Sequence, residues 1–271
     1  MADKRLLAAR PDLAASHLKG QVEAQHFVEG EVCSVARGRT PLRARPSDDA
    51  LQDSELLMGE TVSVYERKNG WAWLQAKTDS YVGYARETAL GPVTEADARI
   101  VLPLAPLLSA PDAKSPLRDL LPLNAKLKSG TRHGDFVETE AGFVHGKALA
   151  PLDRTAADFV AVAEQFLGVP YVWGGKSFEG LDCSGLIQTA LQAAGITAPR
   201  DTDMMEQALG RAVPRAELRR GDLVFWKGHV GVMRDSDTLL HANAYFMQVT
   251  SEPLAAMLAR VTTSVTAIKR L

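Results

Sequence analysis

Cysteine is scarce in this sequence, and so are long hydrophobic runs and any excess of one charge. Only Cys33 and Cys183 occur among 271 residues, which excludes the disulfide framework that holds many small secreted domains together. The net charge of −2 provides no broad attraction for nucleic acid or an anionic membrane surface, so we expect neither as a partner. No apolar run approaches the ~18 residues of a membrane-spanning helix.

The first ten residues carry Lys4 and Arg5 but only a few apolar side chains before Pro11. A secretory signal needs about 7–15 apolar residues and a small-residue cleavage site, and this pattern is missing. The sequence therefore predicts a cytoplasmic protein, or a periplasmic one if its N-terminus has already been processed. Hydrophobic residues make up 46% of the chain, enough for the cores of two or three small domains.

The residue pattern changes three times along the chain, which predicts four segments. Residues 1–26 contain short helix-like pieces and are expected to form an N-terminal helical segment. Residues 27–91 hold short apolar runs separated by turns, among them Asn69-Gly70, a pair typical of β-hairpins. Residues 92–152 repeat this pattern, with prolines in the joining loops. Each of the two segments predicts a small β-barrel, whereas helices followed by antiparallel strands over 153–271 predict an α+β domain.

Two helices are predicted early in this last segment. The first covers residues 155–167 and is capped by Asp153 or Thr155. The second begins at Cys183, because apolar residues recur on one face from there up to Gly195, a typical terminating residue. Asp182 would then lie at or just before the cap.

Cys183 is the candidate nucleophile. A thiol at a helix start lies among backbone N–H groups without intrahelical partners, and the helix dipole favours thiolate over thiol there. The alternative is a small buried hydrophobic residue, which many free cysteines are. Cys33, in a strand-like run of valines, is expected to be such a packing residue.

A thiolate nucleophile needs a base and a group that orients the base. His229 begins one predicted strand and His241 lies near the end of the next, so a hairpin centred on Asp235 would place the two rings directly opposite each other on one face. The same register pairs the apolar Val230 and Leu240 on the other face. Two hydrogen-bonded structural histidines are the alternative. A zinc site of these histidines and Cys183 is disfavoured because no fourth ligand is evident.

Five segments, in this order, resemble the successive motifs of the NlpC/P60 cysteine peptidases. They are Tyr171-Val172-Trp173-Gly174-Gly175, Leu181-Asp182-Cys183-Ser184-Gly185-Leu186, Pro199-Arg200-Asp201-Thr202, Gly221-Asp222-Leu223-Val224-Phe225 and His229-Val230-Gly231-Val232. The preceding segments resemble bacterial SH3 domains less specifically. The resemblance implies an α+β, papain-like NlpC/P60 catalytic domain preceded by two small SH3-like β-barrels, a combination similar to γ-D-glutamyl-L-diamino acid endopeptidases.

The resemblance also implies the catalytic roles. Cys183 is the nucleophile, His229 the general base and then acid, and His241 the residue that orients His229. No metal and no cofactor are expected.

Substrate-binding roles follow from the same resemblance. The residue before the nucleophile, Asp182, would bind the free α-amino group of a terminal L-alanine, and Ser184 and Thr202 match assisting positions. Trp173 matches a pocket wall, although a core tryptophan would look the same. A tyrosine of the first SH3 domain would close the pocket, with Tyr81 the first candidate and Tyr84 the second. Met205 departs from the family, which usually has glutamine there, and Gln207 lies two residues later.

The predicted function is hydrolysis of the γ-D-glutamyl-diaminopimelate bond in peptidoglycan stem peptides with a free N-terminal L-Ala, during recycling of cell-wall peptides. One alternative is a peptidoglycan-binding module whose papain-like domain is inactive. Another is an amidase or acyltransferase on the same scaffold. The oligomeric state does not follow from the sequence.

Overall fold

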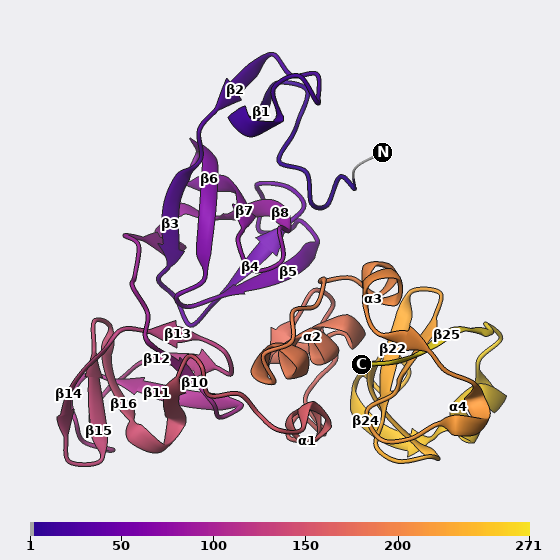
Figure 1. The fold of residues 1–271 in the computed structure, drawn as a ribbon. Coiled ribbons are helices and arrows are strands. Elements are labelled where there is room, and N and C mark those ends of the chain that lie inside the picture. The colour runs from indigo at the N-terminus through magenta and orange to yellow at the C-terminus, as the bar shows by residue number, and fades with distance from the viewer. Residues whose placement is uncertain (1–2) are drawn as a thin grey trace. The chain divides into compact units, whose positions relative to one another are not determined.

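The computed structural model describes residues 3–271, which form two compact units (Figure 1). The first ends at Leu152 and the second covers Asp153–Leu271. In the described part of the chain, no helix is both long and apolar enough to cross a membrane.

The N-terminal segment is not helical, contrary to the prediction for residues 1–26. Over its described residues it forms strand β1 (Leu13–Ala15), a single 3-10 turn η1 (Ser16–Leu18) and the start of β2 (His26–Val28), which pairs in parallel with β1. Pro11 precedes β1, and Gly20, at φ +84°, follows η1. A stretch this short between two helix breakers cannot sustain an isolated helix, so its backbone pairs across strands instead.

The first β-module is a seven-stranded sheet that wraps one hydrophobic core. Its strand order is β5-β4-β8-β7-β6-β3-β9, and every pairing is antiparallel. The strands are β3 (Glu31–Val35), β4 (Arg39–Arg43), β5 (Gln52–Leu57), β6 (Thr61–Lys68), β7 (Trp71–Ala76), β8 (Val82–Arg86) and β9 (Leu90–Gly91), with the 3-10 turn η2 (Glu87–Ala89) before β9. The predicted Asn69-Gly70 turn joins β6 to β7, and both of its residues have positive φ, as a type I′ hairpin requires.

The second β-module repeats this strand order in two sheets, β13-β10-β17 and β12-β11-β16-β15-β14. The strands are β10 (Ala98–Ile100), β11 (Leu104–Leu108), β12 (Leu117–Pro122), β13 (Lys126–Leu127), β14 (Ser129–His133), β15 (Phe136–Thr139), β16 (Gly142–His145) and β17 (Leu149–Pro151), with η3 (Gly146–Ala148) before β17. In each module the last strand directly follows a 3-10 turn and pairs with the first strand. Val35 pairs with Leu90 in the first module, and Ile100 pairs with Leu149 in the second. The repeat of strand order therefore extends to the register of the closing pair.

The second unit contains four short α-helices. They are α1 (Phe159–Glu164), α2 (Cys183–Ala193), α3 (Thr202–Ala208) and α4 (Leu254–Arg260). The predicted helix over 155–167 is thus shorter and begins later, because the Asp158 carboxylate accepts from the N–H of Val160 and caps it there. Helix α2 ends before Gly195, at φ +77°, as predicted.

The second unit also contains a six-stranded antiparallel sheet, which contacts α2 and α4. Its order is β20-β25-β21-β22-β23-β24. The strands are β20 (Arg211–Ala212), β21 (Leu223–Trp226), β22 (His229–Met233), β23 (Thr238–Asn243), β24 (Gln248–Pro253) and β25 (Val265–Arg270); a separate hairpin joins β18 (Lys176–Ser177) to β19 (Gly180–Leu181), and η4 (Arg215–Glu217) precedes β21. Helix α2, almost wholly buried, packs against β22 and β23. This contact brings the cysteine helix to the two histidine strands.

Candidate active site

Helix α2 begins at Cys183, as the sequence predicts, and Asp182 is its N-cap. Oδ1 of Asp182 accepts from the N–H of Gly185 at 2.6 Å. A Cβ at position 185 would lie 2.0 Å from the carbonyl oxygen of Gly175, so only glycine allows the loop to approach the helix this closely. The result is a thiol held at the helix start and only 7% exposed.

The thiol of Cys183 is surrounded by groups from three elements. Its Sγ lies 3.7 Å from Oγ1 of Thr202 and 4.0 Å from the carbonyl oxygen of Gly228. Burial raises the pKa of Cys183, the Asp182 carboxylate raises it further, and hydrogen bonds from Thr202, Val230 and Ser184 oppose the rise only in part. The backbone N–H of Ser184, at the helix start, does lower this pKa as expected, but the loss of hydration outweighs it.

The two histidines meet, but in a register different from the predicted one. Strands β22 and β23 pair Val232 with Leu240, whereas a turn centred on Asp235 would pair Val232 with Thr238, so the hairpin is shifted by two residues. The Asp235 carboxylate accepts from the N–H groups of Asp237 and Thr238 and thereby moves the turn centre. A shift of two keeps both rings on one face.

A 2.8 Å hydrogen bond joins Nε2 of His229 to Nδ1 of His241. Burial lowers the pKa of His229 to about 3, assisted by the neighbouring His241, and burial also lowers the pKa of His241. Both rings are therefore neutral near pH 7. The unprotonated imidazole has a free nitrogen that can accept a proton, although as a weaker base than an exposed histidine. The resting pair is thiol and imidazole instead of the thiolate that the helix start suggested.

Glu252 on β24 completes the chain of hydrogen bonds, and the sequence analysis missed it. Its Oε1 lies 3.0 Å from Nε2 of His241, and Arg260 of α4 binds the same carboxylate through both oxygens. Arg260 lowers the pKa of Glu252, so the carboxylate is ionised and can only accept. His241 must then donate from Nε2 and accept at Nδ1, and His229 must donate from Nε2. Its Nδ1 is left as the basic nitrogen.

No strand was predicted after the one that holds His241, so nothing in the sequence pattern placed Glu252 near the histidines. In the sheet, His241 pairs with Thr250 and Leu239 pairs with Glu252. A charged residue inside an otherwise strand-like run, on the same face as His241, was the one available signal.

The Asp182 carboxylate is buried and is already bound by several groups of the protein. Besides capping α2, it accepts from the N–H of Gly174 at 2.8 Å and forms two hydrogen bonds with Arg200, at 3.0 and 2.7 Å. Arg200 is fully buried and Asp182 is 6% exposed. A buried guanidinium thus already balances the charge of Asp182. Its role as the receptor for a substrate ammonium group stays a prediction, and the ammonium group would have to share this carboxylate with Arg200.

Ser184 and Thr202 both lie close to Cys183. The Ser184 hydroxyl accepts from Nη1 of Arg200 at 2.9 Å, and Thr202 begins α3 beside the thiol. Met205 is fully buried one turn further along α3, whereas Gln207 is exposed. Gln207 therefore does not take the place of the glutamine usually found at position 205.

The predicted aromatic residues lie in different settings. Trp173 is 62% exposed, so it is not a core tryptophan, and its role as a pocket wall stays a prediction. Tyr81 packs in the core of the first β-module, and the Tyr84 hydroxyl accepts from Arg10 at 2.8 Å. Both belong to the first unit, and their role in closing the pocket also stays a prediction. Tyr171 was missed: burial and then the charges of Cys183 and Asp182 raise its pKa to about 12.

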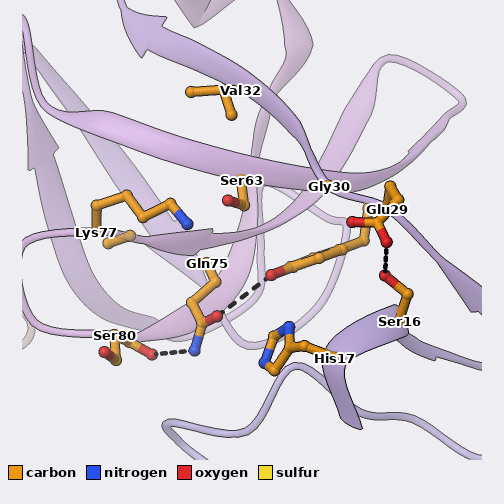
Figure 2. A pocket seen from close by; sticks show the side chains of 11 residues that line it. Ser16, His17, Glu29, Gly30, Val32, Ser63, Gln75, Lys77 and Ser80 are labelled. Atoms are coloured by element: carbon orange, nitrogen blue, oxygen red, sulfur yellow. Dashed lines mark hydrogen bonds between the residues drawn. The ribbon is translucent and has the colours of Figure 1, made fainter. Parts of the chain in front are cut away.

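A pocket of about 430 Å³ lies in the first unit (Figure 2). Several of its polar groups bond to one another: the Ser16 hydroxyl to Glu29, the Tyr65 hydroxyl to Gln75 at 3.3 Å, and the Gln75 amide to the carbonyl of Ser80 at 3.0 Å. These mutual bonds satisfy much of the lining, and the pocket contains none of the predicted site residues.

Among residues 3–271, no group of three or more His, Cys, Asp or Glu side chains is arranged to hold a metal ion. Nε2 of His229 and Nδ1 of His241 are bonded to each other instead.

Comparisons with known proteins agree with this architecture. The NlpC/P60 family model matches residues 168–266, and that of the bacterial dipeptidyl-peptidase Sh3 domain matches residues 42–90. The second SH3-like assignment, residues 92–152, stays a prediction. A crystal structure of an NlpC/P60 family protein from Bacillus cereus has the same fold, with a TM-score of 0.75 and 20% identity, covering 89% of this chain and 99% of that one.

Two curated relatives are named gamma-D-glutamyl-L-lysine dipeptidyl-peptidase. The one from Bacillus cereus is 37% identical over 95 residues, 32% of this chain and 28% of that protein. The one from Bacillus subtilis is 31% identical over 224 residues, 72% of this chain and 73% of that protein. Since the similarity extends over most of both chains and coincides with the five motifs, this chain belongs to the NlpC/P60 family.

Proposed function

We propose that this chain is a cysteine endopeptidase that hydrolyses the γ-D-glutamyl-diaminopimelate bond of peptidoglycan stem peptides with a free N-terminal L-Ala. The observation that carries the proposal is the chain of hydrogen bonds from Glu252 through His241 to His229, whose strand and preceding turn contact the thiol of Cys183. A purely structural histidine pair would need neither an ionised carboxylate bonded to one ring nor a thiol next to the strand of the other.

The first step transfers the thiol proton to the imidazole. Gly228 and Val230, the sequence neighbours of His229, both contact the thiol, and we assign the basic Nδ1 of His229 as the acceptor of the thiol proton. The sulfur then forms a bond to the amide carbon, and the carbonyl electron pair moves to oxygen. The backbone N–H of Cys183, at the helix start, is the donor we assign to this oxyanion, because that of Gly185 already donates to the Asp182 carboxylate.

The second step breaks the amide bond. Imidazolium His229 gives its proton to the leaving nitrogen, the C–N bond breaks, and the acyl group remains on Cys183 as a thioester. Water, deprotonated by His229, then attacks the thioester carbon and releases a carboxylic acid, while the proton returns to the thiol. The neighbouring Glu252 carboxylate stabilises the positive charge on the histidine pair during both transfers.

The names of the relatives support the choice of substrate. A dipeptidyl-peptidase releases two residues from a free N-terminus, and cleavage of the γ-D-glutamyl bond in L-Ala-γ-D-Glu-diaminopimelate would release such a dipeptide. A relative named as a peptidoglycan endopeptidase supports the same class of substrate. A cytoplasmic place for this reaction stays a prediction, which fractionation of the cells that make the protein would check.

The test uses the full chain and two tripeptides, L-Ala-γ-D-Glu-meso-diaminopimelate and its N-acetylated form. We expect release of diaminopimelate from the free peptide only, measured by mass spectrometry, and loss of this activity in Cys183→Ala. Cys33→Ala is the matched control and should stay active, because Cys33 packs in the first β-module. A folded protein with Cys183 intact that cuts neither peptide would contradict the enzyme and favour the inactive binding module. Equal cleavage of both peptides would contradict the free N-terminus.

A further inference from the structure

A pocket of about 310 Å³ lies beside the two histidines within the second unit. His229, His241 and Lys227 line it, and Cys183 does not. We propose that this pocket receives the diamino acid that leaves when the bond is cut, and that Lys227 binds a carboxylate of that diamino acid. The inference rests on the proposed function and specifies its substrate.

The roles of Cys183 and His229 in the reaction are the reason for assigning the leaving group to this pocket. Cys183 keeps the acyl half of the substrate, whereas His229 must reach the nitrogen of the half that leaves. The pocket contains the ring of His229 but not the thiol, so we assign it to the half of the substrate that leaves and not to the acyl half.

The charge of the pocket favours an anion. Of its described lining residues none is Asp or Glu, and two are cationic, Lys227 and Arg260. Glu252 already binds Arg260 through two hydrogen bonds, and the guanidinium lies 4.2 Å from the ring centre of Tyr245. Lys227 is exposed in the turn between β21 and β22, and none of the hydrogen bonds and ion pairs found among residues 3–271 uses its ammonium group. Its positive charge is the one that a ligand would meet.

A second observation points to a ligand with acceptor atoms. Nε1 of Trp226 and Nδ2 of Asn243 belong to lining residues, are buried, and have no hydrogen-bond partner among residues 3–271. Buried donors of this kind are rare unless an acceptor reaches them. The remaining wall, with Met257, Val261 and Tyr245, suits the methylene chain of a diamino acid.

The carboxylate that Lys227 binds has two possible sources. Every tripeptide of this class ends in the α-carboxylate of its diamino acid, and diaminopimelate carries a second carboxylate on its side chain. An L-lysine peptide would instead bring an ε-ammonium group into the same pocket, where Lys227 would repel it.

Three peptides separate these sources, all beginning L-Ala-γ-D-Glu and ending in meso-diaminopimelate, L-lysine or L-lysine amide. They are compared with wild type, Lys227→Met and the control Lys269→Met, whose side chain belongs to β25 and does not line the pocket. For the diaminopimelate peptide we expect Lys227→Met to raise KM about two- to fivefold and leave kcat unchanged, the size typical of an exposed ion pair. Lys269→Met should leave both constants unchanged.

A rise in KM for the diaminopimelate peptide alone identifies the side-chain carboxylate as the ligand, and a rise for both free acids but not the amide identifies the α-carboxylate. No rise in KM for any peptide, or an equal rise for all three, would overturn the inference. Absence of cleavage by the wild type would overturn the proposed function instead. Equal melting temperatures of the two variants and wild type would show that each is folded.

Discussion

Two carboxylate–arginine pairs support the two halves of the site, and they differ in how far solvent reaches them. Asp182 and Arg200 hold the nucleophile helix, with side-chain exposures of 9% and 0%. Glu252, which is hydrogen-bonded to His241, and its partner Arg260 have side-chain exposures of 8% and 24%. Arg200 also binds Ser184, whereas Arg260 packs against the exposed ring of Tyr245.

This difference in exposure leads us to expect that one pair contributes mainly to stability and the other mainly to reactivity. Removing one partner of a fully buried pair leaves a charge that water cannot reach, and this is costly. The charge of a pair near the surface is partly screened by water, so its removal costs less. Asp182–Arg200 should therefore matter most to the fold, and Glu252–Arg260 most to the protonation of the histidines.

The largest expected effect is that of Arg200→Met on stability. It leaves the Asp182 carboxylate buried without its cation, and we expect a loss of about 3–5 kcal/mol in the free energy of unfolding. Urea denaturation of the full chain measures it. Adding Asp182→Asn removes the stranded charge while an amide oxygen can still cap α2, so the double variant should be more stable than Arg200→Met alone. If the losses in the free energy of unfolding of the two single variants simply add in the double variant, Asp182 and Arg200 do not act as a buried ion pair.

Glu252→Gln should change activity more than stability. Without the ionised carboxylate, the positive charge on the histidine pair is less stabilised, and the amide can donate to His241 and reverse its tautomer. We expect kcat to fall about 100-fold with little change in KM, measured on the diaminopimelate tripeptide.

Glu164→Gln is the matched control for Glu252. Glu164 is also bound by arginines, Arg220 at 2.9 Å and Arg234 at 2.8 Å, but these contacts lie away from the histidines. Its replacement should leave kcat unchanged. Equal losses in the two variants would mean that Glu252 acts only through the fold.

The same comparison marks the limit of what the sequence could predict. The cap and start of α2 and the strands of His229 and His241 follow from local patterns, and the structure confirms them. Neither arginine pairing could be predicted, because Arg200 is 18 residues from Asp182 and its contact depends on packing between α2 and the loop before α3. The histidine register was wrong by two residues because side-chain bonds of Asp235 set the turn.

A smaller effect concerns pH. The pKa of His229 is about 3 in the folded protein, and an unfolded histidine titrates near 6.5. Between these values the unfolded chain binds a proton that the folded chain does not, so stability is present above about pH 6.5 and is lost as pH falls towards 3. His229→Gln should lose less stability between about pH 7 and pH 4 than wild type. The contribution of His241, which has the same sign, should remain.

Urea denaturation of wild type and variant at several pH values in this range checks the slope. His17→Gln, an exposed histidine of the first unit, should keep the wild-type slope. Parallel curves for wild type and His229→Gln would contradict a neutral, buried base.

The smallest expected effect is at Thr202, whose hydroxyl lies 3.7 Å from Sγ of Cys183 and favours the thiolate. Thr202→Val keeps the shape but removes the hydrogen bond, so the pKa of Cys183 should rise further and alkylation by iodoacetamide should slow about two- to fivefold. A Cys33→Ala background leaves Cys183 as the reacting thiol. Thr189→Val, which removes a buried hydroxyl bonded to the carbonyl of Lys176, is the control and should leave the rate unchanged. Equal slowing in both variants would assign the effect to packing of α2 instead of to the hydroxyl beside the thiol.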